Sequence, residues 1–295
     1  MFGLGEVLAG LNILDRLGKF WNWFRAKQNP PVESVAVRFV RLFESHGVHR
    51  NQIPRFFGHS LTLKDVQDDA SLFAKLDETI LETVCKRFAV RREWLDGAES
   101  QIHICHDFYK HPEAFTDFIE HLKANNPDGD LQGVLIAPNE RDWQAYALVI
   151  LQETVGSVGD KPIYRYHLCN NWAFTYWKAR AYLTACVAIA WKHKVYVHGI
   201  YMPKKEVNRL AEGKTMLGWQ GEGIWELGHK GWDPEDMALQ PEAFLESVDP
   251  EHDNFGIKSG LGLWLDLEQR GLMATGFPVP NARQLFQQEL EKFST

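Results

Sequence analysis

The sequence has little cysteine and no excess of basic charge. Only four of its 295 residues are cysteines, at positions 85, 105, 169 and 186, and they lack both the paired spacing of a metal site and the density of a disulfide scaffold. With 32 Lys and Arg against 39 Asp and Glu, the formal charge is −7. This balance excludes a basic field over the whole protein, so any nucleic-acid site must be local. We expect a reducing, cytoplasmic location.

Motifs of known catalytic chemistry are missing as well. The sequence has no Gly-x-Ser-x-Gly elbow and no His-Glu-x-x-His, and the glycine-rich stretch 218–223 is not followed by Lys-Ser or Lys-Thr. Four possible zinc ligands lie close together, His103, Cys105, His106 and His111, but no second Cys or His pair follows at the spacing of a zinc finger. We therefore expect neither a metal nor a cofactor, and an enzyme is the least favoured class.

A long uninterrupted hydrophobic run is also lacking. The most apolar stretch, Met1–Phe24, contains four charged residues, which argues against a membrane span, and its first basic residue comes too late for a secretory signal. Its apolar residues recur at spacings of three and four, which predicts an amphipathic helix within residues 1–28. We expect this helix to dock on its own chain or on a second copy. Lying on a membrane surface is the less favoured alternative.

The remaining composition is typical of a globular protein with two domains. Hydrophobic residues make up 45% of the chain and charged residues 24%, and a domain usually takes about 100 to 200 residues. Pro30 and Pro31 end the first helix, and a helical pattern then fills residues 32–100. Residues 101–130 are predicted to form a connecting helix, Ile102–Lys123, followed by a polar linker.

Residues 131–295 change to a pattern of strands. Short β-prone or alternating runs occur at 133–137, 147–151 and 161–168, a helical pattern follows at 172–191, and another strand is expected at 194–201. The predicted fold class is therefore α+β, in which an N-terminal, all-helical bundle precedes an antiparallel sheet domain with covering helices.

A ligand pocket is one interpretation of the aromatic residues in this second half. Trp172, Tyr176 and Arg180 are four residues apart, so on a helix they would share one face and could enclose a planar or anionic ligand. Tyr164 and Tyr166 on the preceding strand complete the candidate ligand-binding set. Packing of the same side chains in a core is the alternative interpretation.

One pattern in the helical unit resembles a known family. Residues 48–58, 61–66 and 77–97 resemble the helix-turn-helix of the Cro and phage-repressor family, over roughly a quarter of the chain. The last stretch matches best, because a helix with an apolar stripe ends at Val90 and a short helix then presents an apolar pair, Trp94 and Leu95, before a glycine. In such a unit the closing helices hold the two reading helices at their angle.

The resemblance implies a set of DNA contacts. Gln52–Phe57 would be the positioning helix and Thr62–Gln67 the recognition helix, with Thr62 as its N-cap. Lys64 and Gln67 would touch bases or phosphates. The residues that would reach the DNA backbone are Arg50, Asn51 and Arg55.

The leading hypothesis is a DNA-binding transcriptional regulator with a C-terminal domain that senses a ligand or a partner. Such readers bind double-stranded DNA as homodimers, and the apolar N-terminal helix offers a surface for pairing. A small molecule, or a basic protein attracted by the acidic stretch 225–254, would be the sensed partner. The alternative is an adaptor that uses the helix-turn-helix for protein contacts. An enzyme with an unrecognised site is the third hypothesis.

Overall fold

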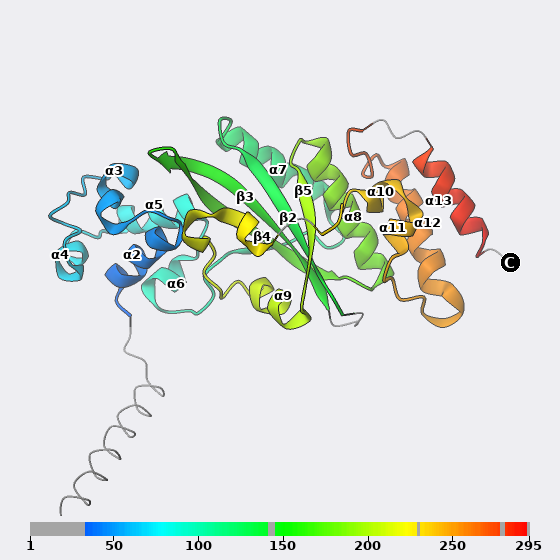
Figure 1. Ribbon diagram of the computed structural model, residues 1–295, viewed down its shortest axis with the longest axis horizontal. Coiled ribbons are helices and arrows are strands. Elements are labelled where there is room, and N and C mark those ends of the chain that lie inside the picture. The colour runs from blue at the N-terminus through cyan, green and yellow to red at the C-terminus, as the bar shows by residue number, and fades with distance from the viewer. Residues whose placement is uncertain (1–32, 141–144, 229–230, 278–280, 294–295) are drawn as a thin grey trace, which may run out of the picture.

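The computed structural model describes residues 33–140, 145–228, 231–277 and 281–293. A five-stranded sheet lies at the centre, a helical bundle packs at one end of it, and the C-terminal helices pack at the other end (Figure 1). The amphipathic helix expected within residues 1–28 lies outside the described residues.

The helical bundle is built from amphipathic helices whose apolar faces are buried as the sequence predicts. Phe43 lies at its centre, with ring centroids 4.9 Å from Phe39, 5.4 Å from Phe57 and 5.1 Å from Phe88. The elements of the bundle are α2 (Val35–Ser45), η1 (Arg50–Gln52), α3 (Ile53–Phe57), α4 (Asp69–Phe73), α5 (Glu78–Phe88) and α6 (Arg92–Asp96).

The predicted recognition helix at Thr62–Gln67 is wrong, because this segment forms turns and α4 begins only at Asp69. The carboxylate of Asp65 accepts hydrogen bonds from the backbone N–H of Thr62 (2.9 Å) and from its hydroxyl (2.6 Å). Because the N–H of Asp65 also donates to the hydroxyl of Thr62 (3.3 Å), the two residues form the reciprocal pair that is typical of a helix start, but only turns follow before Asp68 caps α4. Two large apolar side chains of this region are not buried in the bundle, since Leu63 is 65% exposed and Phe73 is 61% exposed.

The predicted connecting helix at Ile102–Lys123 is also corrected. Its first part is a short strand, β1 (Cys105–Asp107), which pairs in parallel with β4. The helix α7 (Pro112–Asn125) begins only at Pro112, where the missing N–H of proline costs no helical hydrogen bond.

The sheet is mixed, whereas the sequence predicts an antiparallel one. Its strands are β2 (Leu131–Pro138), β3 (Tyr146–Val158), β4 (Lys161–Ala173) and β5 (Val197–Met202), with the order β1-β4-β3-β2-β5. β2, β3 and β4 form antiparallel pairs, but β1 is parallel to β4 and β5 is parallel to β2. The parallel pairing of β5 follows from a helical crossover after β4, as parallel strands require.

The helix predicted to start at Trp172 starts five residues later, as α8 (Trp177–Lys192). Trp172 and Ala173 instead continue β4, because they pair with Ala147 and Tyr146 of β3. The strand partner supplies the backbone hydrogen bonds, and this outweighs the helix-like spacing of the aromatic side chains.

Helices cover both faces of the sheet. α7 and α8 pack on one face, where the buried residues include Leu135, Val149 and Leu183, and α9 (Lys204–Ala211) packs on the other (Figure 1). Within the described part of the chain, no helix is long and apolar enough to cross a membrane. The remaining elements are η2 (Trp219–Gly221), η3 (Gly223–Leu227), α10 (Asp236–Leu239), α11 (Pro241–Leu245), η4 (His252–Asn254), α12 (Phe255–Gln269) and α13 (Ala282–Glu291).

The bundle and the sheet share a core. Ile163 of β4 is fully buried among the apolar residues of the bundle, and the ring of His46 in the bundle lies 5.6 Å from that of Tyr166. Gly156 of β3 has a φ of +153°, and a Cβ at this position would lie 3.0 Å from the ring of Phe56. Glycine therefore allows α3 to approach the strand closely.

Candidate functional site

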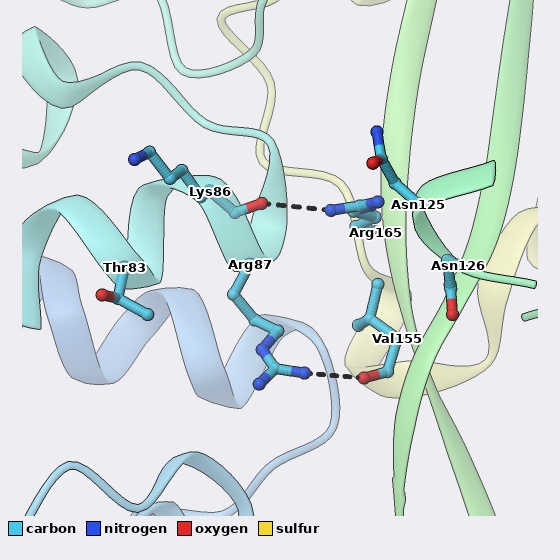
Figure 2. Close-up of a pocket in the computed structure, with 7 residues that line it drawn as sticks. All are labelled: Thr83, Lys86, Arg87, Asn125, Asn126, Val155 and Arg165. Carbon is cyan, nitrogen blue, oxygen red and sulfur yellow. Dashed lines mark hydrogen bonds between the residues drawn. The ribbon is translucent and has the colours of Figure 1, made fainter. Parts of the chain in front are cut away.

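A groove follows the line along which the bundle meets the sheet, and three adjacent hollows form it. The outer hollow has a volume of about 240 Å³, the middle hollow, drawn in Figure 2, about 290 Å³, and the inner hollow about 880 Å³. Arg87 and Val155 line both the outer and the middle hollow, and Lys86, Asn125 and Arg165 line both the middle and the inner hollow. The hollows therefore form one surface, which we name the junction groove.

Three cations without acidic partners line the outer and middle hollows. Arg55 of α3 and Lys86 of α5 are exposed, and Arg87 of α5 is half-buried. The guanidinium of Arg87 donates to the carbonyl of Val155 (2.9 Å) and lies 5.8 Å from the ring centre of Phe56. Among the residues that the structure describes, none of the three cations has a carboxylate within 4.0 Å. This end of the groove therefore carries uncompensated positive charge.

The local sequence explains how α5 presents these cations. Asp77 caps the start of α5 by accepting a hydrogen bond from the N–H of Ile80 (2.8 Å), and the helix ends at Ala89, whose φ of +53° is left-handed. Lys86 and Arg87 occupy its last turn, where the helix dipole favours positive charge. Figure 2 shows the Arg87 side chain extending from α5 toward Val155, whereas Lys86 faces Arg165 with its backbone carbonyl and its side chain extends away from the strands.

A buried carboxylate organises the wall of the groove where the middle and inner hollows meet. Glu153 of β3 is 2% exposed, and its two oxygens accept hydrogen bonds from the guanidinium of Arg165, at 2.7 and 2.6 Å. The side-chain amide of Asn126 also donates to Glu153 (2.8 Å), and Nε2 of His167 lies 2.9 Å from Oε2. Arg165 further donates to the carbonyl of Lys86 (3.2 Å). This cluster ties α5, α7, β3 and β4 together.

The charges of the cluster balance one another. Burial alone would raise the pKa of Glu153, but the hydrogen bonds from His167, Arg165 and Asn126 outweigh burial and lower the pKa to about 2. Burial lowers the pKa of His167 in spite of its bond to Glu153, and burial together with nearby His167 lowers the pKa of His106 to about 4. At neutral pH the carboxylate therefore compensates Arg165, while both imidazoles are uncharged.

The inner hollow combines apolar side chains with polar and charged ones. Ile104 is 44% exposed there, and the ring centroid of half-buried His106 lies 4.5 Å from that of Phe118. The two arginines at its α6 side are engaged by acids: Arg91 pairs with Glu99 at 2.7 Å, and Arg92 pairs with Glu78, Glu82 and Asp96. The inner hollow therefore adds hydrogen-bonding groups and the rings of Phe118 and His106 to Lys86, a free cation that it shares with the middle hollow.

The structure separates the six residues predicted to touch DNA. Arg55 lines the junction groove. Arg50 instead donates to the carbonyl of Val66 (2.6 Å) and to the carboxylate of Asp69 (2.7 Å), and Thr62 is bonded to Asp65. The side chain of Gln67 lies 3.4 Å from that of Ser71, while Asn51 and Lys64 are exposed. They do not form the single helical face that the resemblance implies.

The residues predicted to bind a ligand lie mostly in closed surroundings. Arg180 is 1% exposed, its guanidinium donates to the carbonyls of Phe174 (3.1 Å), Phe244 (3.2 Å) and Glu246 (2.9 Å), and burial lowers its pKa to about 10. Trp172 is fully buried on β4, so it does not share a helix face with Arg180. These contacts are those expected of core packing.

The three tyrosines of that set are dispersed. Tyr166 is buried beside Trp219 on the face of the sheet that α9 covers, and Tyr164 packs on the same face. Tyr176 is half-buried at the start of α8 and contacts Trp177.

Apart from Arg55, sequence reasoning did not assign the cations that line the groove to a binding site. Arg165 and His167 alternate with Tyr164 and Tyr166 along β4, so they point to the opposite face of the sheet, toward α7. The alternation of aromatic with basic side chains in this strand is the signal that could have found them. No comparable signal marks Lys86, because a lysine in the last turn of a helix is common.

The four possible zinc ligands are not arranged around one point. His103 is fully buried, and its Nε2 accepts a hydrogen bond from the N–H of Leu217 (3.2 Å), while the Sγ of Cys105 accepts from the side-chain amide of Gln101 (3.5 Å) and donates to the carbonyl of Ala211 (3.6 Å). In the described part of the chain, no group of three or more His, Cys, Asp or Glu residues is placed to hold a metal ion.

Comparisons with protein families, with curated proteins and with solved structures find no match for this chain.

Proposed function

We propose that the protein binds a phosphate-bearing anion in the junction groove, between its helical bundle and its sheet. The observation that carries this proposal is the set of three cations, Arg55, Lys86 and Arg87, which line neighbouring hollows and have no carboxylate partner among the described residues. In a chain of formal charge −7, cations left uncompensated beside a concave surface attract an anion to that surface.

This proposal keeps the two-part plan of a ligand-responsive regulator but moves the anion contacts away from Thr62–Gln67. A ligand held between α5 and β4 would touch both parts of the protein, and its binding energy could then bias how they pack. Repressor-type binding of double-stranded DNA by a homodimer is a separate proposal, and it rests on the resemblance of residues 32–97 to the helix-turn-helix family.

Titration calorimetry with inorganic pyrophosphate at low salt tests the proposal. The parent protein should bind pyrophosphate, and the double variant Lys86→Gln/Arg87→Gln should lose most of the affinity. Lys178→Gln is a matched control, because Lys178 lies over Trp177 on α8 and does not line the groove. Absence of binding by the parent, or equal affinity in the double variant, would overturn the proposal.

A second candidate function is an adaptor that uses the bundle for protein contacts. The observation that favours it is the exposure of two large apolar side chains, Leu63 (65%) in the segment assigned to DNA recognition and Phe73 (61%) at the end of α4. Large exposed apolar side chains mark interaction surfaces where they form a contiguous patch.

Sedimentation of the parent and of a Leu63→Ser/Phe73→Ser variant tests the adaptor candidate in its simplest form, contact between two copies. The parent should associate as its concentration rises, and the variant should stay monomeric. A parent that remains monomeric at all concentrations would exclude self-association through this surface.

A further inference from the structure

The two ends of the junction groove have different chemistry, and together they match the two parts of a nucleotide. The outer and middle hollows present the free cations Arg55, Lys86 and Arg87. The inner hollow, which shares Lys86 and Arg165 with the middle one, presents ring faces and apolar side chains. A ligand that follows the groove therefore meets positive charge first and an aromatic surface next.

The inner hollow has the size and the surfaces that a nucleobase requires. Its volume of about 880 Å³ falls within the range of about 300 to 1,000 Å³ that is usual for small-molecule sites. The aromatic rings that line it are those of Phe118 and His106, which pack on each other with centroids 4.5 Å apart, and Ile104 is 44% exposed beside them. Nucleobases of all kinds stack on aromatic rings, because every base has a flat π-face.

Polar groups lie at the edge of this surface. The amide nitrogen of Asn125 lies 2.8 Å from Nε2 of His121, and both side chains are exposed and line the inner hollow. An amide and an imidazole can donate to and accept from the edge of a base. The guanidinium of Arg165, held in place by Glu153, lies where the cationic hollow joins the aromatic one.

We propose that the junction groove holds a nucleotide unit, with its phosphates beside Lys86 and Arg87 and its base against His106 and Phe118. This inference rests on the proposed function, since it names the class of the phosphate-bearing ligand. Two sources supply the same chemistry: a free nucleotide, or one unit of a single-stranded nucleic acid whose bases are unpaired. The bases of a duplex are stacked on one another and their faces are not available.

Titration calorimetry at low salt compares four probes on the full chain: inorganic pyrophosphate, ADP, a single-stranded oligo(dA) decamer, and the duplex formed by that decamer and its complement. ADP should bind at least about tenfold more tightly than pyrophosphate, because stacking of one base on an aromatic side chain contributes roughly that factor or more. Tighter binding of the decamer than of ADP assigns the groove to a nucleic-acid strand, and the reverse order assigns it to free nucleotides.

Two groups of variants locate the two subsites. Phe118→Ala and, at the more exposed position, Ile104→Ala should lower the affinity for ADP toward that for pyrophosphate and leave pyrophosphate binding unchanged. The Lys86→Gln/Arg87→Gln variant should weaken both ligands. Unchanged pyrophosphate binding also reports that the Phe118 and Ile104 variants are folded.

The outcomes separate the inference from the proposed function. If pyrophosphate binds as tightly as ADP and the decamer, the base subsite does not exist, while anion binding stands. If no probe binds, both proposals fail. If the duplex binds more tightly than the single strand, the inference is overturned and duplex recognition takes its place.

Discussion

Arg87 and Arg165 line the same hollow of the junction groove, but only Arg165 is neutralised by a carboxylate. Arg165 is held by both oxygens of Glu153, a carboxylate with 2% exposure, whereas Arg87 meets a backbone carbonyl and a phenyl ring. The first arginine joins parts of the fold, and the second is left to attract an anion. The position of the carboxylates, more than the number of cations, therefore decides where an acidic protein presents a basic site.

The largest effect should come from removing the carboxylate that compensates Arg165. Glu153→Gln leaves that guanidinium without its counter-charge, and we expect a loss of about 3 kcal/mol in the free energy of unfolding, measured with urea. The control is Glu222→Gln, which breaks the exposed pair of Glu222 with Lys161 (3.0 Å) and should cost less than about 1 kcal/mol. Equal losses in the two variants would contradict the distinction between the two arginines.

A third arginine extends the comparison to a fully closed site. Arg180→Met leaves three backbone carbonyls without a donor, and we expect it to lower the free energy of unfolding by about 2 kcal/mol. Pyrophosphate binding should not change, because Arg180 does not line the groove. Lys178→Ala on the same helix should cost no more than about 0.5 kcal/mol. A binding defect in Arg180→Met would reopen the ligand pocket inferred from the sequence.

The inner end of the groove should also be the acid-sensitive end. The pKa of His106 is about 4 in the folded protein and 6.5 in its ordinary state, so the unfolded chain binds a proton first as pH falls. The stability contributed by the neutral imidazole is therefore present above pH 6.5 and lost as pH falls toward 4. Measured by urea unfolding across this range, the free energy of unfolding should depend less steeply on pH in His106→Asn than in the parent protein. Identical slopes in the two proteins would show that His106 does not contribute to the loss of stability at acid pH.

Glu153 continues the acid sensitivity to lower pH. Its folded pKa of about 2 is depressed from 4.5, so its contribution is present above pH 4.5 and is lost as pH falls through about 2. The parent protein should therefore continue to lose stability below the range in which His106 titrates, and this second decline should be smaller in Glu153→Gln.

The smallest effect on stability should come from replacing Lys86, the exposed cation of α5. Lys86→Gln removes no ion pair within the described residues, and we expect the free energy of unfolding to change by no more than about 0.5 kcal/mol. Binding of the oligo(dA) decamer should nevertheless lose about 0.7 from its slope of log K against log salt, the value for one phosphate contact to a single strand. An unchanged slope would place the phosphates elsewhere.

The bundle was predictable from sequence to the extent that its helices are amphipathic. The apolar stripes of α2 and α5 show a period near 3.6 residues, and their buried faces are those that this period predicts. The prediction failed at Thr62–Gln67, where Asp65 accepts hydrogen bonds from Thr62 but only turns follow, and α4 begins at Asp69. It failed again at Trp172, where pairing with β3 extends the strand.

The junction groove could not be predicted, because its walls come from distant segments of the chain. Arg87 meets Val155 and Lys86 meets Arg165 only because α5 packs against the β3–β4 hairpin, in a register that the sequence does not reveal. Periodicity shows which residues of a strand share a face, but not which helix will cover that face. The carboxylate that neutralises Arg165 is set by the same register, through the pairing of Glu153 with Arg165.

The long β3–β4 hairpin should make folding a single cooperative event. Each of its strands has 13 residues, and its far end places Ile163, with 0% exposure, inside the core of the bundle. Helices that precede the sheet in sequence therefore complete their core only after the hairpin has formed, which raises the contact order and slows folding. A fragment that ends near residue 100 would leave bare the apolar surface that Ile163 covers, and we expect such a fragment to aggregate.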